Sequence, residues 1–254
     1  MRITCYSIGT IFMNAVEVND LTFSYADGDA ILRGVSFCVS EGELFAIGGS
    51  SGSGKTTLCR ILCGIIPNAV KGILSGAISV AGIDPTAARL SQVALHIGMV
   101  FQETDSQIIC TAVEDELAFG LENLCRPPDE IKRRVDELLS EFGLEALRYT
   151  DPARLSGGQK KLLTIAAVLA TSPPVLIMDE PLSGLDPDGR GLVLAAIGKQ
   201  RLNGRTVIIV DHDLKALSFA DKWLLLRDGI AAALGTPADI ARNEEMLAEL
   251  GVLA

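Results

Sequence analysis

The sequence predicts an α/β protein with a mixed sheet at its core, an antiparallel β portion near the start and a helical subdomain. Three observations support this fold class. A glycine-rich loop, Gly49–Thr56, separates an apolar run from a helical stretch, short continuous apolar runs recur along the chain, and alternating runs precede the first of them. Continuous runs are typical of strands buried on both faces, whereas alternation indicates strands with one solvated face.

The expected strands fall into two groups. The alternating runs predict the antiparallel portion at Ala15–Val18, Leu21–Tyr25 and Val35–Val39. The continuous runs predict a buried, mostly parallel sheet made of Leu44–Ile47, Val175–Met178, Thr206–Val210 and Trp223–Leu226.

The glycine-rich loop has the pattern of a P-loop in its strand-to-helix context, because it follows Leu44–Ile47 and precedes Thr57–Leu62. Its backbone N–H groups and the helix N-terminus favour phosphate, Lys55 supplies a cation for the β- and γ-phosphates, and Thr56 is a ligand for Mg²⁺. The alternative is a flexible Gly/Ser loop. The candidate nucleotide-binding residues here are Gly49, Ser50, Ser51, Gly52, Ser53, Gly54, Lys55, Thr56 and Thr57.

The run Val175–Met178 ends in two carboxylates, Asp179 and Glu180. Successive strand residues point to opposite sides of a sheet. Asp179 is therefore expected to hold Mg²⁺, and Glu180, beyond the strand end, to polarise an attacking water. The alternative is a solvated exit from the strand.

Together these residues resemble the nucleotide-binding subunits of ABC transporters. The likeness extends from about Asn14 to Pro237, with the motifs in the family's order. It implies an adenine-stacking aromatic, a glutamine loop, a signature, a D-loop and a switch histidine, at Tyr25, Gln102, Leu155–Gln159, Ser183–Asp186 and His212 respectively. Several of these motifs are weak alone, but jointly, at these spacings, they are specific.

Three of these residues have plainer interpretations. Tyr25 could be an ordinary strand residue, Gln102 a surface hydrogen-bonding amide at a strand end, and His212 a satisfied loop histidine. The motif order favours nucleotide contacts for all three. The second histidine, His96, has no partner motif around it.

The signature is expected to open a helix that runs through Leu169, with Ser156 as its N-cap and free N–H groups in its first turn. The resemblance implies that Ser156, Gly157, Gly158 and Gln159 cover the γ-phosphate held by an opposite subunit, so that a dimer encloses two ATP molecules, and Asp186 is included among the nucleotide-binding residues. The alternative is a helix cap alone. Leu162 stands where the family usually has arginine.

The resemblance also implies the chemical roles. ATP is the nucleotide, and Lys55, Gln102, Glu180 and His212 are the expected catalytic residues, with His212 stabilising developing charge. The expected Mg²⁺ ligands are Thr56, Gln102 and Asp179.

Composition limits the partners. The formal net charge is −10, without a basic cluster beyond Arg133-Arg134 and Lys160-Lys161, so direct binding of nucleic acid is not expected. Cys59 and Cys63 share a helix face, which more often indicates core packing than a metal site. No apolar stretch approaches the roughly 18 residues that span a bilayer, so any membrane role requires a partner.

The chain is expected to divide into an ATPase domain at 13–237, with a helical subdomain at about 103–170, and a short tail at 238–254. Residues 1–12 are expected to be a loose extension, or to precede a native start at Met13. Within the subdomain a helix is predicted, started by Pro128-Asp129 and stopped by Gly143. Its core-facing stripe is Ile131, Val135, Leu138, Leu139 and Phe142.

The first part of the helical subdomain resembles the ATPases of cobalt-type and energy-coupling-factor importers in particular, at Asp105–Gln107 and Val113–Asn123. This resemblance implies a peripheral ATPase at the cytoplasmic face of the cell membrane. It would work as a homodimer or a heterodimer with a related ATPase, and move the coupling helices of a membrane subunit. The cargo would be a vitamin or a transition-metal ion such as cobalt or nickel. Alternatives are another ABC branch, a soluble ABC ATPase acting on DNA or ribosomes, and an ATP sensor without hydrolysis.

Overall fold

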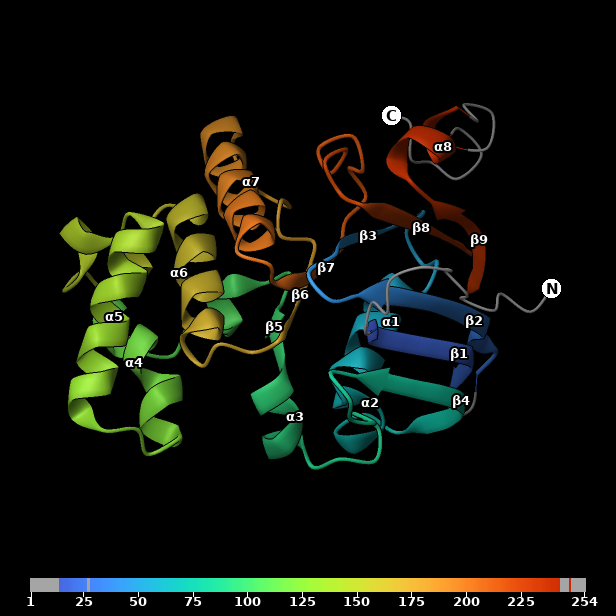
Figure 1. Ribbon diagram of the computed structural model, residues 1–254, viewed down its shortest axis with the longest axis horizontal. Helices are drawn as coiled ribbons and strands as arrows, with labels where there is room; N and C mark the ends of the chain where they lie inside the picture. The colour runs from blue at the N-terminus through green and yellow to red at the C-terminus, as the bar shows by residue number, and fades with distance from the viewer. Residues whose placement is uncertain (1–13, 27, 243–246, 248–254) are drawn as a thin grey trace.

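A computed structural model describes residues 14–26, 28–242 and 247. A six-stranded sheet of order β5-β6-β7-β3-β8-β9 occupies the centre, and a three-stranded sheet of order β2-β1-β4 lies beside it (Figure 1). The predicted mixed sheet and the antiparallel β portion are both present.

The six-stranded sheet is parallel except at one edge, where β9 pairs antiparallel with β8. The four apolar runs predicted as buried strands are β3, β6, β7 and β8. The edge strand β9 was not predicted, because its alanines give little apolar alternation. The bounds are β3 Leu44–Gly48, β5 Ile97–Val100, β6 Val175–Asp179, β7 Thr206–Val210, β8 Lys222–Arg227 and β9 Ile230–Gly235.

Residues of β6 show why these strands read as continuous apolar runs. Val175 and Ile177 face one hydrophobic core, Leu176 and Met178 face the other, and all four are fully buried. Because the sheet is covered on both sides, each strand needs apolar residues at every position.

The three-stranded sheet consists of β1 (Asn14–Tyr25), β2 (Ala30–Ser40) and β4 (Gly72–Val80), all antiparallel. The two runs predicted at its start form one strand. A register shift between Val18 and Leu21 and a positive φ of 51° at Asp20 reveal a bulge, which interrupts the alternation without ending the strand.

The helices include one whose start and stop were both predicted from sequence signals, and one whose N-cap was predicted. The helix α5 begins at Pro128 and ends before Gly143, which has a left-handed φ of 66°, and α6 begins directly after Ser156. The bounds are α1 Lys55–Leu62, α2 Ile65–Asn68, α3 Leu90–His96, α4 Val113–Asn123, α5 Pro128–Phe142, α6 Gly157–Ala170, α7 Pro187–Leu202 and α8 Pro237–Ala241, with 3₁₀ turns at Thr104–Ser106, Glu145–Leu147 and Pro152–Arg154.

Helices cover both faces of the central sheet. The helix α1 packs with the three-stranded sheet in one core, through Leu58, Ile61 and Leu62, while residues of α4, α5, α6 and α7 form the other. Figure 1 shows α4 and α5 at one end of the molecule, with α6 between them and β5. The domain limits stay a prediction, and residues 1–12 and most of 238–254 lie outside the described residues.

Candidate active site

A cavity of about 590 Å³ opens beside the carboxyl ends of the parallel strands. Loops that follow β3, β5, β6 and β7 each contribute to its wall, and these four strands are neighbours in the sheet. Ligands in open α/β sheets bind at this edge. The lining residues are Ile31, Ser51, Gly52, Gly54, Lys55, Thr56, Thr57, Gln102, Glu180 and His212.

The loop between β3 and α1 requires its glycines. Gly49 has a φ of 142°, and a Cβ there would lie 2.2 Å from the carbonyl oxygen of Leu226. Gly54 is the left-handed residue, with a φ of 102°, that precedes α1. These positions let the backbone turn tightly into the helix, which directs the first N–H groups of α1 to the cavity.

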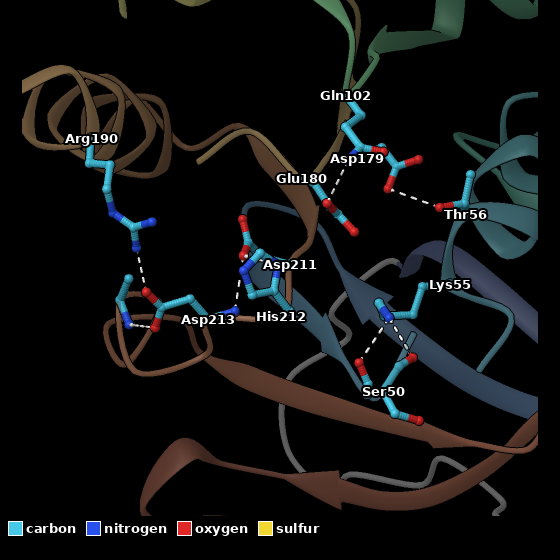
Figure 2. A network of polar contacts seen from close by, with 12 residues as sticks. Ser50, Lys55, Thr56, Gln102, Asp179, Glu180, Arg190, Asp211, His212 and Asp213 are labelled. Carbon is cyan, nitrogen blue, oxygen red and sulfur yellow. Dashed lines mark hydrogen bonds and ion pairs between the residues drawn. The ribbon is translucent and has the colours of Figure 1, made fainter. Parts of the chain in front are cut away.

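Lys55, the first residue of α1, is largely buried at the base of this loop. Its Nζ donates to the carbonyl oxygens of Gly49 at 2.8 Å and Ser50 at 2.9 Å (Figure 2). Burial lowers the pKa of Lys55, and nearby Glu180 and Asp179 partly offset this. The amine is therefore held against the cavity wall at the end of a flexible side chain, where a phosphate can attract it.

Asp179 ends β6 with only 3% of its surface exposed. The hydroxyl of Thr56 donates to Asp179 Oδ1 at 3.4 Å. Burial raises the pKa of Asp179, so an ionised carboxylate here is poorly solvated and favours a cation. A carboxylate and a hydroxyl are oxygen donors of the kind that Mg²⁺ prefers, and the side chains therefore fit this ion.

Glu180 leaves the strand with a positive φ of 46°, which is uncommon for a residue with a side chain. Its backbone N–H donates to the carbonyl of Val210 at 2.7 Å, and its Oε2 accepts from Gln102 Nε2 at 2.8 Å. The turn brings the Glu180 carboxylate into the cavity, whereas Asp179, one residue earlier, stays buried.

His212 follows β7, and its side chain is 62% exposed. The imidazole Nδ1 lies 3.6 Å from Asp211 Oδ1, and that aspartate is completely buried. Burial raises the pKa of Asp211, while hydrogen bonds from backbone N–H groups of Asp213 and Leu182 oppose the rise. The imidazole of His212 thus reaches the cavity, while the preceding residue, Asp211, is buried and anchors the loop.

Tyr25 lies beside the P-loop helix. Its hydroxyl is 3.5 Å from Thr57 Oγ1, and its ring packs edge-on against Phe23 with 5.0 Å between centroids. Tyr25 does not line the cavity itself, so adenine stacking stays a prediction.

The signature residues lie elsewhere on the chain. Ser156 caps α6 through a reciprocal capping box with Gln159, and both Ser156 and Gly157 are exposed. Gly158 packs closely on α7, because a Cβ there would lie 2.8 Å from Gly189 Cα. Asp186 is itself the N-cap of α7. None of the five predicted residues lines the cavity just described, namely Ser156, Gly157, Gly158, Gln159 and Asp186.

Sequence reasoning missed several buried charged residues, and two of them, Asp211 and Lys161, lie near the cavity residues. Asp211 was overlooked beside His212, and Lys161, 1% exposed, donates from Nζ to the carbonyl oxygens of Phe101 and Gln102. Burial lowers the pKa of Lys161 to about 8. Charged residues are normally assigned to solvated faces, so the pattern carried no signal for either.

Two further expectations concern α1 and α6. Cys59 and Cys63 are both buried, and Cys63 Sγ contacts Met99 Sδ at 3.4 Å, as expected for core packing. Among the described residues, no group of three or more His, Cys, Asp or Glu side chains is arranged to hold a metal ion. Leu162, which replaces the usual arginine, is buried in the core.

The family model for the ABC transporter matches residues 32–183, which is more than half of the chain. The chain belongs to the ABC transporter family. It is therefore an ABC transporter ATPase, and its fold is the P-loop fold of that family.

Similar proteins agree with this assignment. The ABC ATPase is 39% identical to the energy-coupling factor transporter ATP-binding protein EcfA1 of Enterococcus faecalis, over 93% of this chain and 84% of that protein. It is 37% identical to EcfA of Methanothermobacter thermautotrophicus, over 91% and 74%. The solved structure of cbiO1 from Clostridium perfringens, described as part of the ABC transporter complex cbiONQ, has a TM-score of 0.83 and 32% identity, over 94% and 95%.

The part of the ABC ATPase that the structure describes contains no helix both long and apolar enough to cross a membrane.

Proposed function

We propose that this chain is the ATP-binding and ATP-hydrolysing subunit of an energy-coupling-factor importer that takes up a micronutrient, either a vitamin or a transition-metal ion such as cobalt or nickel. One observation carries the proposal for catalysis. A single cavity is lined by Lys55, Thr56, Gln102, Glu180 and His212, which come from four loops. The names of the similar EcfA and cbiO1 proteins support the transporter branch.

Each side chain has a distinct role in the proposed hydrolysis. Lys55 and the P-loop N–H groups hold the phosphates, Thr56, Gln102 and Asp179 bind Mg²⁺, and His212 stabilises charge on the γ-phosphoryl group. Mg²⁺ supplies charge neutralisation. Glu180 orients a water and accepts its proton while the water oxygen bonds to the γ-phosphorus. The bond from that phosphorus to the β–γ bridging oxygen breaks, which releases ADP and phosphate.

The complete site is proposed to form between two chains, as a homodimer or with a related ATPase. The N-terminus of α6 is exposed at Ser156 and Gly157, and neither residue lines this chain's own cavity. A second chain's α6 is the proposed cover for the γ-phosphate, and Asp186 lies on the proposed contact between the chains.

The partner in the membrane is proposed to be an integral subunit whose coupling helices follow the opening and closing of this dimer. The ATPase would then sit peripherally at the cytoplasmic face. The net charge of −10 argues against a direct nucleic-acid partner, and so against the soluble ATPase alternative.

Hydrolysis is tested with the purified complex of this chain and its copurifying membrane subunits. Glu180→Gln is expected to retain ATP binding and to lose turnover by about 10²-fold or more, because the amide cannot accept the proton. Glu41→Gln, which changes an exposed glutamate in a turn, is the matched control. Unaltered turnover in Glu180→Gln, or a wild type that binds ATP without hydrolysis, would refute the proposal.

Cargo is tested by reconstituting the same complex in vesicles. ATP-dependent accumulation of a labelled vitamin, or of Co²⁺ or Ni²⁺, is expected with wild-type protein and absent with Glu180→Gln. Export of such a compound, or copurification with ribosomes instead of membrane proteins, would place the chain in another branch.

A further inference from the structure

His212 sits between two aspartates that hold its loop in different ways. Asp211 points into the protein, where its Oδ1 accepts from the backbone N–H of Asp213 at 3.0 Å. Asp213 points outward, where its Oδ1 accepts from the N–H of Ala216 at 3.2 Å and its Oδ2 pairs with Arg190 Nη2. Figure 2 shows this pair reaching across to α7.

Arg190 lies in the first turn of α7, directly after the D-loop. Its backbone N–H donates to the carbonyl of Asp186 at 2.9 Å, and Asp186 Oδ1 accepts from Gly189 N at 2.8 Å. The Arg190 and Asp213 side chains are 30% and 34% exposed. The guanidinium is therefore fixed to a capped helix end, and its partner to the histidine loop.

These contacts form a continuous path between Glu180 and His212, the two cavity residues proposed to act on the water and on the γ-phosphate. Ser183 N donates to the carbonyl of Glu180 at 3.1 Å, which ties the D-loop to the Glu180 turn. The D-loop leads into α7, Arg190 pairs with Asp213, and Asp213 is the neighbour of His212. The strands β6 and β7 join Glu180 and His212 on the other side.

We propose that Arg190 is a positioning residue, whose ion pair with Asp213 fixes the His212 loop relative to the Glu180 turn. This inference rests on the proposed function. The exposed imidazole has little packing of its own to hold it, and displacement of a catalytic group by about 1 Å costs up to about 10²-fold in rate. A partly exposed ion pair adds little to stability, so its loss should appear in turnover rather than in unfolding.

The first test compares turnover in the complex. Arg190→Met and Asp213→Asn are each expected to lower kcat by about tenfold, with KM for ATP and Tm close to wild type, and the double variant is expected to lose no more than either single one. The charge exchange Arg190→Asp with Asp213→Arg should regain part of the loss. Arg242→Met, which breaks the exposed pair between Asp239 of α8 and Arg242, the C-cap of that helix, is the control.

The second test does not need ATP hydrolysis. The chain has only two histidines, so the imidazole NMR spectrum contains two sets of signals, which His96→Gln assigns. Arg190→Met is expected to shift or broaden the His212 signals and to leave those of His96 unchanged, whereas Arg242→Met should alter neither. Unchanged His212 signals, additive losses in the double variant, or losses that follow Tm would overturn the inference. A wild type without ATPase activity would instead refute the proposed function.

Discussion

Gln102 Nε2 donates a hydrogen bond of 2.8 Å to Glu180 Oε2, which joins the ends of two adjacent parallel strands. The bond uses the amide nitrogen of Gln102 and leaves its amide oxygen available to a cation. One side chain can therefore orient the carboxylate that handles water and also contribute to the Mg²⁺ shell.

Gln102→Glu separates these two functions. The substitution keeps an oxygen donor but replaces the hydrogen bond with two carboxylates in close contact, which favours protonation of one of them. We expect the Mg²⁺ concentration for half-maximal activity to stay within about threefold, while kcat falls on the order of tenfold. Titration of ATPase activity with Mg²⁺ measures both, and an unchanged kcat would contradict the orienting role.

Asp179→Asn should stabilise the protein without ligands, because it removes a buried charge. The pKa of Asp179 is raised in the folded state, so the folded chain binds more protons and loses stability as pH rises from the ordinary carboxyl range. The Asp179→Asn variant should not show this loss of stability with rising pH. In EDTA at pH 7 its unfolding free energy should exceed that of wild type by roughly 1 kcal/mol, and by less near pH 4. Urea unfolding at both values checks the difference, and stabilisation by Mg²⁺ should be absent in the variant.

For Lys161 we expect the opposite change, a stability that rises with pH in the alkaline range. Its pKa of about 8 lies below the ordinary 10.5, so between these values the unfolded chain binds more protons and stability rises with pH. The complete rise from this group is about 3 kcal/mol. Lys161→Met should lack it, whereas the contribution of Lys55 is common to both proteins. Urea unfolding at pH 7.5 and 9.5 measures this change. An equal gain in unfolding free energy in wild type and in Lys161→Met would contradict the prediction.

Ser156 combines a helix cap with a proposed contact to the γ-phosphate of another chain. Ser156→Ala should lower the unfolding free energy by about 1 kcal/mol, whereas Ser156→Asp retains an acceptor for the N–H of Gln159 and should lower it by only a few tenths. Each substitution, introduced into the Glu180→Gln protein, should weaken ATP-dependent dimerisation measured by light scattering. Ser156→Asp should weaken it more than Ser156→Ala, because the aspartate charge repels phosphate. Normal dimers with Ser156→Asp would mean that Ser156 is only a cap.

Tyr25 is tested through its ring and its hydroxyl separately. Tyr25→Phe loses only the 3.5 Å contact with Thr57 Oγ1, and should bind ATP within about twofold of wild type. Tyr25→Ala loses the stacking surface and should weaken binding roughly tenfold. Calorimetric titration with ATP distinguishes them. Wild-type affinity in Tyr25→Ala would make Tyr25 an ordinary strand residue.

Local chemistry explains why much of the molecule was predictable. The glycines of Gly49–Thr56, the cap at Ser156 and the stop at Gly143 act through backbone angles and hydrogen bonds within a few residues. The continuous apolar runs reflect burial on both sheet faces. Neither β4 nor β9 was predicted, because their small residues carry a weak pattern and their pairing with other strands decides their conformation.

The sequence by itself determined the phosphate loop, the buried strands and the identity of the residues available for catalysis, since each is encoded in short spacings. Only the tertiary structure decided that Gln102 bonds Glu180, that Lys161 and Asp211 are buried, and that Arg190 reaches the loop of His212. These contacts join residues distant in sequence, and their energies depend on desolvation and relative position, which no local pattern records.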